Sequence, residues 1–181
     1  MRSAIPLSLL LACGACKDKP SGTAADPPVA ASGSSAVTFQ TLPFQPGARI
    51  PTEFTCDGTD QSPPLSWTGS GDARSWVLIL DDPDAPGGTF THWMLYDIPG
   101  ATNALPRSSS GIGTPGKNDF GKTSYGGPCP PKGSNHRYFF KLYAVNVPNL
   151  GLPQGATRVQ LDKAMASHQV ATTSLMGTYG R

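Results

Sequence analysis

The chain contains little charge, and the two signs nearly balance. Aspartate, glutamate, lysine and arginine make up 14% of its 181 residues, whereas roughly 25% is typical of a soluble domain. The formal net charge is +2, and the sequence has no run of basic residues interleaved with aromatic ones. We therefore expect no nucleic-acid partner, because nucleic acids are bound by concentrated positive charge.

The sequence also lacks any apolar run long enough to cross a bilayer as a helix. The short apolar stretch 5–12 follows Arg2 and ends in Leu10-Leu11-Ala12-Cys13. This pattern resembles the lipobox of bacterial lipoproteins, in which the cysteine is acylated after cleavage. We predict a lipoprotein-type signal peptide over residues 1–12 and lipidation of Cys13, with Cys16 as a second candidate and an unstructured start to the chain as the alternative.

Aromatic residues are absent from the segment that follows. Residues 14–36 are mostly Ala, Ser, Gly and Pro and contain a single valine, so they cannot bury enough apolar surface to fold. We predict a flexible, lipid-anchored tether over residues 13–36 and one folded domain over residues 37–181. Tether and anchor together predict that the membrane is a partner and that the protein resides in a bacterial cell envelope, facing the periplasm or the exterior.

Long helical patterns are scarce, whereas 21 glycines and 19 prolines supply many turns. This composition predicts a mostly β domain of short strands that pair antiparallel. Only one helix is expected, from a capping box at Thr157 to about Ser167, followed by a final strand. The predicted strands are residues 37–40, the region around Phe54, 65–67, 76–80, 93–98 and 137–145.

Alternation along two of these strands predicts which side chains share a face. In the later strand His136 lies on one face together with Tyr138, Phe140, Leu142 and Ala144. In the earlier strand the same rule places His92 on one face with Met94 and Tyr96.

Carboxylates and imidazoles gather at neighbouring strand ends. Asp82 and Asp84 follow the apolar run 76–80, and His92 opens the next strand. Pro83 and Pro86 fix φ and should make the intervening loop rigid, as a preorganised site requires. Aspartates at such a position can also simply cap a turn. Further along, the glycine- and proline-rich loop 126–133 precedes His136, and its backbone amides could hold an anion.

These motifs, in this order, resemble the phosphatidylethanolamine-binding protein family, in its bacterial branch of Raf kinase inhibitor-like proteins. The quoted pattern is Asp82-Pro83-Asp84-Ala85-Pro86, His92-Trp93, Gly127-Pro128-Cys129-Pro130-Pro131-Lys132-Gly133 and His136-Arg137-Tyr138. The resemblance covers nearly all of residues 37–181. It implies a central antiparallel sheet packed on a smaller sheet, with one or two short helices. It also implies a small anion pocket at one sheet end, lined by Asp82, Asp84, Pro86, His92, Gly127, Pro130, Pro131, His136 and Tyr138. Thr91 departs from relatives that carry a second histidine there.

A carboxylate repels a phosphate dianion, so the aspartates of such a pocket need another role. They can orient the imidazoles and favour their protonated forms, accept a proton from a singly ionised phosphate, or meet a ligand ammonium group. Imidazoles and glycine-loop amides would then supply the donors. We therefore expect a binding protein for a small phosphorylated or zwitterionic ligand, with no cofactor and no catalytic residues.

Two other functions stay open at this point. Aspartates and histidines could hold a metal that activates water, although the sequence has no His-Glu-x-x-His motif and no Gly-x-Ser-x-Gly elbow for a serine nucleophile. Some members of the resembled family inhibit kinases or serine proteases. Export would separate this chain from cytoplasmic kinases, so an extracytoplasmic protease inhibitor is the main alternative, and no protein partner can be named.

Cysteine is scarce, and only Cys56 and Cys129 lie within the predicted domain. An oxidising envelope favours a disulfide between them, and two buried thiols are the alternative. His168, close to the predicted helix end, is expected to be structural because a cation there complements the helix dipole. The stretch 111–116 matches Gly-x-Gly-x-x-Gly, but it follows serines rather than a strand, so we do not interpret it as a dinucleotide site.

Overall fold

A computed structural model describes residues 36–181. The predicted signal peptide, the lipidation at Cys13 and nearly all of the predicted tether lie outside these residues. Within them, no helix is long and apolar enough to cross a membrane.

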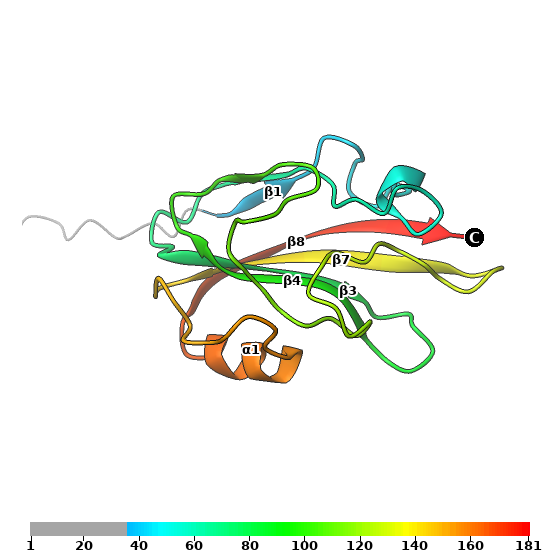
Figure 1. Cartoon of the computed structure of the whole chain (residues 1–181). Coiled ribbons are helices and arrows are strands. Elements are labelled where there is room, and N and C mark those ends of the chain that lie inside the picture. The colour runs from blue at the N-terminus through cyan, green and yellow to red at the C-terminus, as the bar shows by residue number, and fades with distance from the viewer. Residues whose placement is uncertain (1–35) are drawn as a thin grey trace, which may run out of the picture. The chain divides into compact units, whose positions relative to one another are not determined.

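Two antiparallel sheets form the domain (Figure 1). The larger has the order β6-β4-β3-β7-β8 and is built from β3 (Ser75–Asp82), β4 (Phe90–Pro99), β6 (Thr114–Pro115), β7 (Asn135–Val145) and β8 (Gln169–Gly180). The smaller has the order β1-β2-β5 and consists of β1 (Thr38–Gln40), β2 (Leu65–Thr68) and β5 (Ala104–Leu105). The predicted fold class is confirmed.

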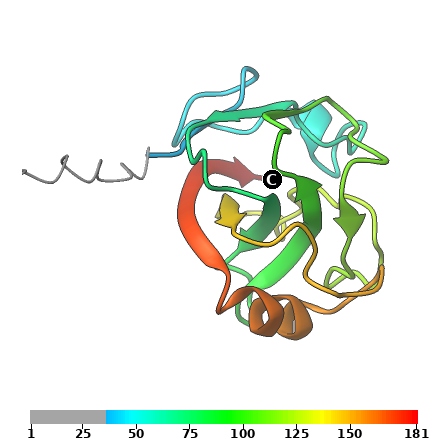
Figure 2. The ribbon, with the colours of Figure 1, turned by 90° about the vertical axis from the view of Figure 1, so that its left-hand side faces the viewer.

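The larger sheet is covered on both faces. One face packs against the smaller sheet through a core that includes Trp67, Trp76 and Phe140. The opposite face carries helix α1 (Arg158–Met165), and Leu161 and Met165 are buried there with Val77 and Ile79 of β3. Figure 2 shows the three layers, with α1 and the smaller sheet on opposite sides of the larger sheet. Every residue of β3 is buried, as a central strand covered on both faces requires.

Most of the expected elements occur close to their predicted positions. Helix α1 begins after the Thr157–Gln160 capping box, in which each side chain accepts a hydrogen bond from the other residue's backbone N–H. The strand expected around Phe54 is wrong, because Thr52–Phe54 forms a 3₁₀ turn (η1) that buries the Phe54 ring. An apolar residue between turns satisfies the sequence pattern of a strand and of a buried turn equally well.

The alternation predicted for β7 is confirmed, since His136 and Tyr138 are buried whereas Asn135 and Arg137 are exposed. The face predicted for His92 is wrong. Trp93 pairs with Leu80 and Thr91 pairs with Asp81, so His92 is an extra residue without a partner on β3. This β-bulge turns the imidazole toward the core between the sheets, while Met94 and Tyr96 pack on the helix side.

Candidate functional site

The end of β3 directs two consecutive carboxylates to opposite faces of the larger sheet. Asp82 lies on the side of the inter-sheet core and contacts His136, whereas Asp81 lies on the side of α1 and contacts Arg158. The period of two along a strand produces this division. The candidate site is therefore built on the Asp82 side, and we use the name histidine cluster for Asp82, His92, His136 and Tyr138.

Asp82 fixes the orientation of His136. The carboxylate Oδ2 lies 2.8 Å from His136 Nδ1, and both side chains are almost fully buried. A carboxylate at this distance accepts a hydrogen bond, so His136 Nδ1 is the donor and carries the hydrogen. The other ring nitrogen, Nε2, then accepts a hydrogen bond when the ring is neutral and donates one when it is protonated.

His92 is held by backbone carbonyls. Its Nδ1 lies 2.9 Å from the Gly126 oxygen and 3.2 Å from the Gly127 oxygen, and both are acceptors, so Nδ1 is again the donor. Burial lowers the pKa of the His92 imidazole below its usual value of 6.5. The ring is therefore neutral near pH 7, and its free Nε2 is an acceptor.

The glycine loop beside His92 is tightly packed. A β-carbon on Gly127 would come within 2.4 Å of the Phe54 carbonyl oxygen and 2.5 Å of Asp60 Oδ1, which only glycine avoids. The Gly127 N–H donates to Asp60 at 2.7 Å. This amide was an expected donor to a bound anion, but the Asp60 carboxylate already occupies it.

A disulfide joins the loop to the segment after η1. Cys56 and Cys129 are bonded, with 5.4 Å between their Cα atoms and a sequence separation of 73. The Cys56 N–H also donates to the Pro128 carbonyl at 3.2 Å. The loop that holds His92 is thus fixed both covalently and by hydrogen bonds.

Tyr138 contributes a polar atom without a partner. Its ring packs edge-on against His92 at 5.3 Å and stacks near His136 at 6.5 Å, measured between ring centroids. The hydroxyl is buried, and no described residue meets it with full hydrogen-bond geometry, although the Asp82 carboxylate and the Cys129 backbone lie close enough to affect its pKa. Burial, together with the neighbouring Asp82 charge, raises the pKa of the phenol, so it stays protonated and can both donate and accept. Buried polar groups are normally paired, which makes this hydroxyl a candidate ligand contact.

The remaining predicted residues lie at the margin. Asp84 turns outward, and its carboxylate accepts hydrogen bonds from the backbone and guanidinium of Arg137 at 2.6 to 2.9 Å. These hydrogen bonds lower the pKa of Asp84 to about 2. Pro130 is buried, whereas Pro86 and Pro131 are exposed. Contacts thus bring Asp82, His92, Gly127, His136 and Tyr138 together, and Asp84 orients the strand end through Arg137.

On the opposite face, an ion cluster that the sequence did not reveal surrounds Asp81. This carboxylate is fully buried and contacts Arg158 at 2.6 Å, Lys141 at 2.8 Å and the Thr91 hydroxyl at 3.1 Å. Thr91 therefore faces away from His92. The three partners come from α1, β7 and β4, and no local pattern signals their meeting.

A small cavity of about 130 Å³ is lined by the glycine loop that holds His92, and none of the four side chains of the histidine cluster is part of its wall. Its wall includes Phe120, whose ring packs edge-on against His92 at 5.2 Å, and it has one charge of each sign, Lys122 and Asp60. Among residues 36–181, no three His, Cys, Asp or Glu side chains converge as metal ligands would.

Comparison with known proteins gives consistent results. The family model described as phosphatidylethanolamine-binding protein matches residues 40–180. A protein of Aquifex aeolicus named UPF0098 is 49% identical over 146 residues, covering 76% of this chain and 85% of its own. A Mycobacterium tuberculosis protein with the provisional name lipoprotein LppC is 37% identical, covering 88% of this chain and 80% of its own.

Two crystal structures resemble the domain. A Chlamydia trachomatis homologue of phosphatidylethanolamine-binding protein, CT736, superposes with a TM-score of 0.77 at 37% identity, covering 81% of this chain and 98% of its own. The YbcL protein of Escherichia coli superposes with a TM-score of 0.74 at 27% identity, covering 82% of this chain and 99% of its own.

Proposed function

The chain belongs to the phosphatidylethanolamine-binding protein family, and from that premise we propose that its histidine cluster binds a small phosphorylated or zwitterionic ligand without transforming it. The observation that carries this proposal is the buried Tyr138 hydroxyl, which no described residue meets with full hydrogen-bond geometry and whose ring packs against the imidazoles of His92 and His136. An unpaired buried hydroxyl costs free energy unless a ligand or water satisfies it.

The protonation pattern restricts the chemistry of the ligand. His92 Nδ1 is already engaged, so its neutral ring offers an acceptor at Nε2. A ligand that only accepts hydrogen bonds, such as a fully ionised phosphate, would face this acceptor unfavourably. A singly protonated phosphate or an ammonium group supplies the donor that the neutral His92 ring requires.

The nearby charges favour the same ligands. Lys122 can meet a phosphate, and the Asp82 carboxylate can attract an ammonium group or stabilise a protonated His136. A phosphoethanolamine-like molecule carries both groups on one short chain. Location in a cell envelope, with a lipid anchor at Cys13, remains part of the proposal, and the lipoprotein name of the mycobacterial relative supports it.

Calorimetric titration with phosphoethanolamine and with inorganic phosphate tests the proposal. His92→Ala should weaken phosphoethanolamine binding about tenfold or more, the loss that corresponds to one hydrogen bond of 1.4 kcal/mol. His168→Ala is the matched control, because His168 contacts Asn146, which follows the end of β7 opposite to His136. Equal affinities of the two variants would remove His92 from the site, and no binding by the unmodified protein would refute the proposal.

The alternative of an extracytoplasmic protease inhibitor rests on relatives alone, and no described loop specifically favours it. A metal-dependent hydrolase is the third possible function and the one we favour least. Metal analysis of the purified protein discriminates it, because a stoichiometric bound metal would contradict the proposal of simple ligand binding.

A further inference from the structure

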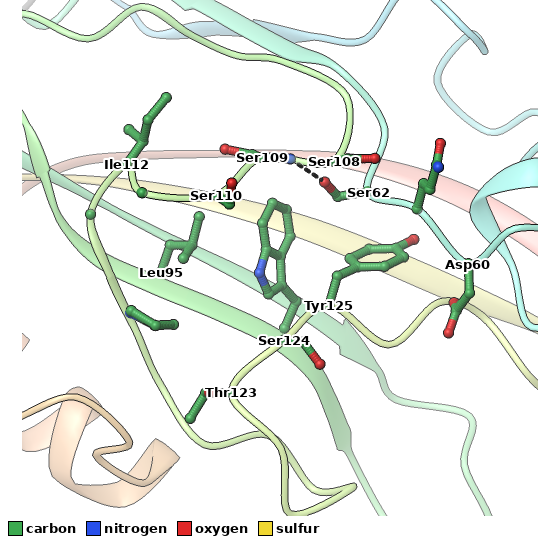
Figure 3. A pocket seen from close by; sticks show the side chains of 15 residues that line it. Asp60, Ser62, Leu95, Ser108, Ser109, Ser110, Ile112, Thr123, Ser124 and Tyr125 are labelled. Atoms are coloured by element: carbon green, nitrogen blue, oxygen red, sulfur yellow. Dashed lines mark hydrogen bonds between the residues drawn. The ribbon is translucent and has the colours of Figure 1, made fainter.

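A second cavity, of about 410 Å³, takes no part in the proposed function (Figure 3). We call it the serine cavity. It shares Tyr125 and Asp60 with the small cavity at the glycine loop and borders Trp93, the neighbour of His92 in β4. Its volume falls within the roughly 300–1,000 Å³ of small-molecule sites.

The lining of the serine cavity is uncharged almost throughout. Six of its side chains are hydroxyls, from Ser62, Ser108, Ser109, Ser110, Thr123 and Ser124. Apolar surface comes from Trp93, Leu95, Ile112 and Tyr125. Asp60 is the only charged residue along it, and this carboxylate already accepts the Gly127 N–H. Because no cationic side chain lines the cavity, it is unsuited to phosphate. Its single carboxylate, Asp60, is already hydrogen-bonded to Gly127, so the cavity is also a poor site for an amine.

The walls are held in place before any ligand arrives. Residues 108–113 form one wall, which we call the serine loop. Ser62 accepts two backbone N–H groups of this loop: its carbonyl accepts from Ser108 (3.0 Å) and its hydroxyl accepts from Ser109 (3.1 Å). The Tyr125 hydroxyl donates to the Phe54 carbonyl at 2.7 Å, and its ring packs edge-on against Trp93 at 5.4 Å. Such preorganisation reduces the entropy that binding would cost.

The serine loop also shows two features that its own packing does not explain. The Ser109 hydroxyl is buried and has no hydrogen-bond partner among the described residues. Ser108 adopts φ of 56°, in the left-handed region that serine rarely occupies. Gly111 and Gly113, from the glycine motif that we rejected as a dinucleotide site, have φ of 72° and 74° and complete the wall. Glycine adopts such angles without strain, whereas the strained backbone of Ser108 is of a kind that is concentrated at functional sites.

We propose that the serine cavity binds a neutral, polyhydroxylated ligand of the saccharide class. A sugar ring has C–H faces for Leu95, Ile112 and the Tyr125 ring, and hydroxyl edges that exchange hydrogen bonds with serines. Both properties match the lining, and the proposal does not depend on a ligand in the histidine cluster.

Nuclear magnetic resonance of the indole N–H groups tests this directly, with N-acetylglucosamine and maltose as probes. The chain has three tryptophans. Trp93 lines the serine cavity, whereas Trp67 and Trp76 line a different one and serve as internal controls. At about 10 mM sugar, a concentration that detects millimolar affinity, at least one probe should shift the Trp93 signal and leave the other two unchanged.

Ser124→Trp should fill the cavity and weaken the binding of that sugar about tenfold or more, while Ser167→Trp in the exposed turn after α1 should not. His136→Ala should leave sugar binding unchanged, which separates this proposal from the phosphate site. The proposal is overturned if neither sugar shifts Trp93, if all three indoles shift together, or if the neutral peptide trialanine shifts Trp93 when the sugars do not.

Discussion

Asp81 and Asp82 are adjacent in sequence and almost fully buried, yet their surroundings differ in kind. Asp81 has two cationic partners and a threonine hydroxyl. Asp82 has one imidazole partner and accepts the Asp84 backbone N–H, but it has no cationic side chain of Arg or Lys among the described residues, and the neighbouring Tyr138 hydroxyl lacks a partner with full hydrogen-bond geometry. The Asp81 side is electrostatically complete, whereas the Asp82 side lacks a partner that a ligand could supply.

This difference shows how one strand can serve both stability and binding. Fully compensated charge fixes α1 to the larger sheet and offers nothing to a ligand. Incompletely compensated polar groups cost stability in the unliganded protein, and binding recovers that cost. The two sides therefore respond differently to substitution.

The largest expected effect comes from removing the cations around Asp81. Arg158→Met combined with Lys141→Met leaves a fully buried carboxylate with only the Thr91 hydroxyl. We expect the free energy of unfolding in urea to fall by about 3–5 kcal/mol. Adding Asp81→Asn should restore much of the loss, because the uncompensated charge disappears. If the triple variant were no more stable than the double one, the uncompensated charge of Asp81 would not be the cause of the lost stability.

The next effect concerns the covalent tie on the Asp82 side. Replacing both Cys56 and Cys129 with serine releases a loop with a sequence separation of 73 residues. We expect a loss of about 2–4 kcal/mol in thermal or urea unfolding. Phosphoethanolamine binding should weaken as well, because the released loop holds His92. Unchanged binding at a temperature where the variant stays folded would show that the loop needs no such tie.

A smaller effect of opposite sign is expected for Tyr138→Phe. The substitution removes a buried hydroxyl that has no partner within the described residues. The free energy of unfolding should rise by about 1 kcal/mol, while phosphoethanolamine affinity falls. Tyr125→Phe provides the contrast, since its hydroxyl donates to Phe54 and its removal should destabilise. A Tyr138→Phe protein that lost stability would mean that the hydroxyl is satisfied in the unliganded state.

The smallest effect is a pH dependence that originates from His92. Burial lowers the pKa of this histidine from 6.5, so below that pH the unfolded chain binds a proton more readily than the folded one. Its contribution to stability is complete above pH 6.5 and declines as the pH falls. In His92→Asn the decline in the free energy of unfolding between pH 7 and pH 5 should be shallower, and an equally steep decline in this variant would show that His92 is not its source.

Much of this architecture could be predicted from the sequence, because alternation and turn residues are local signals. Strands β3 and β7 and the capping box of α1 follow directly from them. The residues His92, His136 and Tyr138 could be selected because they recur in a family pattern. Their protonation roles could not, since these depend on which carbonyl or carboxylate meets each ring nitrogen.

Three features lay beyond local signals. The bulge at His92 depends on the register between β4 and β3, and nothing in residues 90–94 marks the extra residue. The Asp81 cluster requires Arg158, which is distant in sequence. The hydrogen bond from the Gly127 N–H to Asp60 could not be predicted either, because it depends on how the segment after η1 folds back toward the glycine loop.

The bulge in β4 also determines which changes this site can tolerate during evolution. Substituting His92 alters one side chain, but deleting a single residue between Phe90 and Trp93 would restore regular pairing with β3. If Thr91 were the residue lost, His92 would take its place opposite Asp81 and point toward α1, so the binding side would lose its imidazole although the strand still contained it. We expect natural length variation to be accepted in the loop before Phe90 and excluded from the two residues after it.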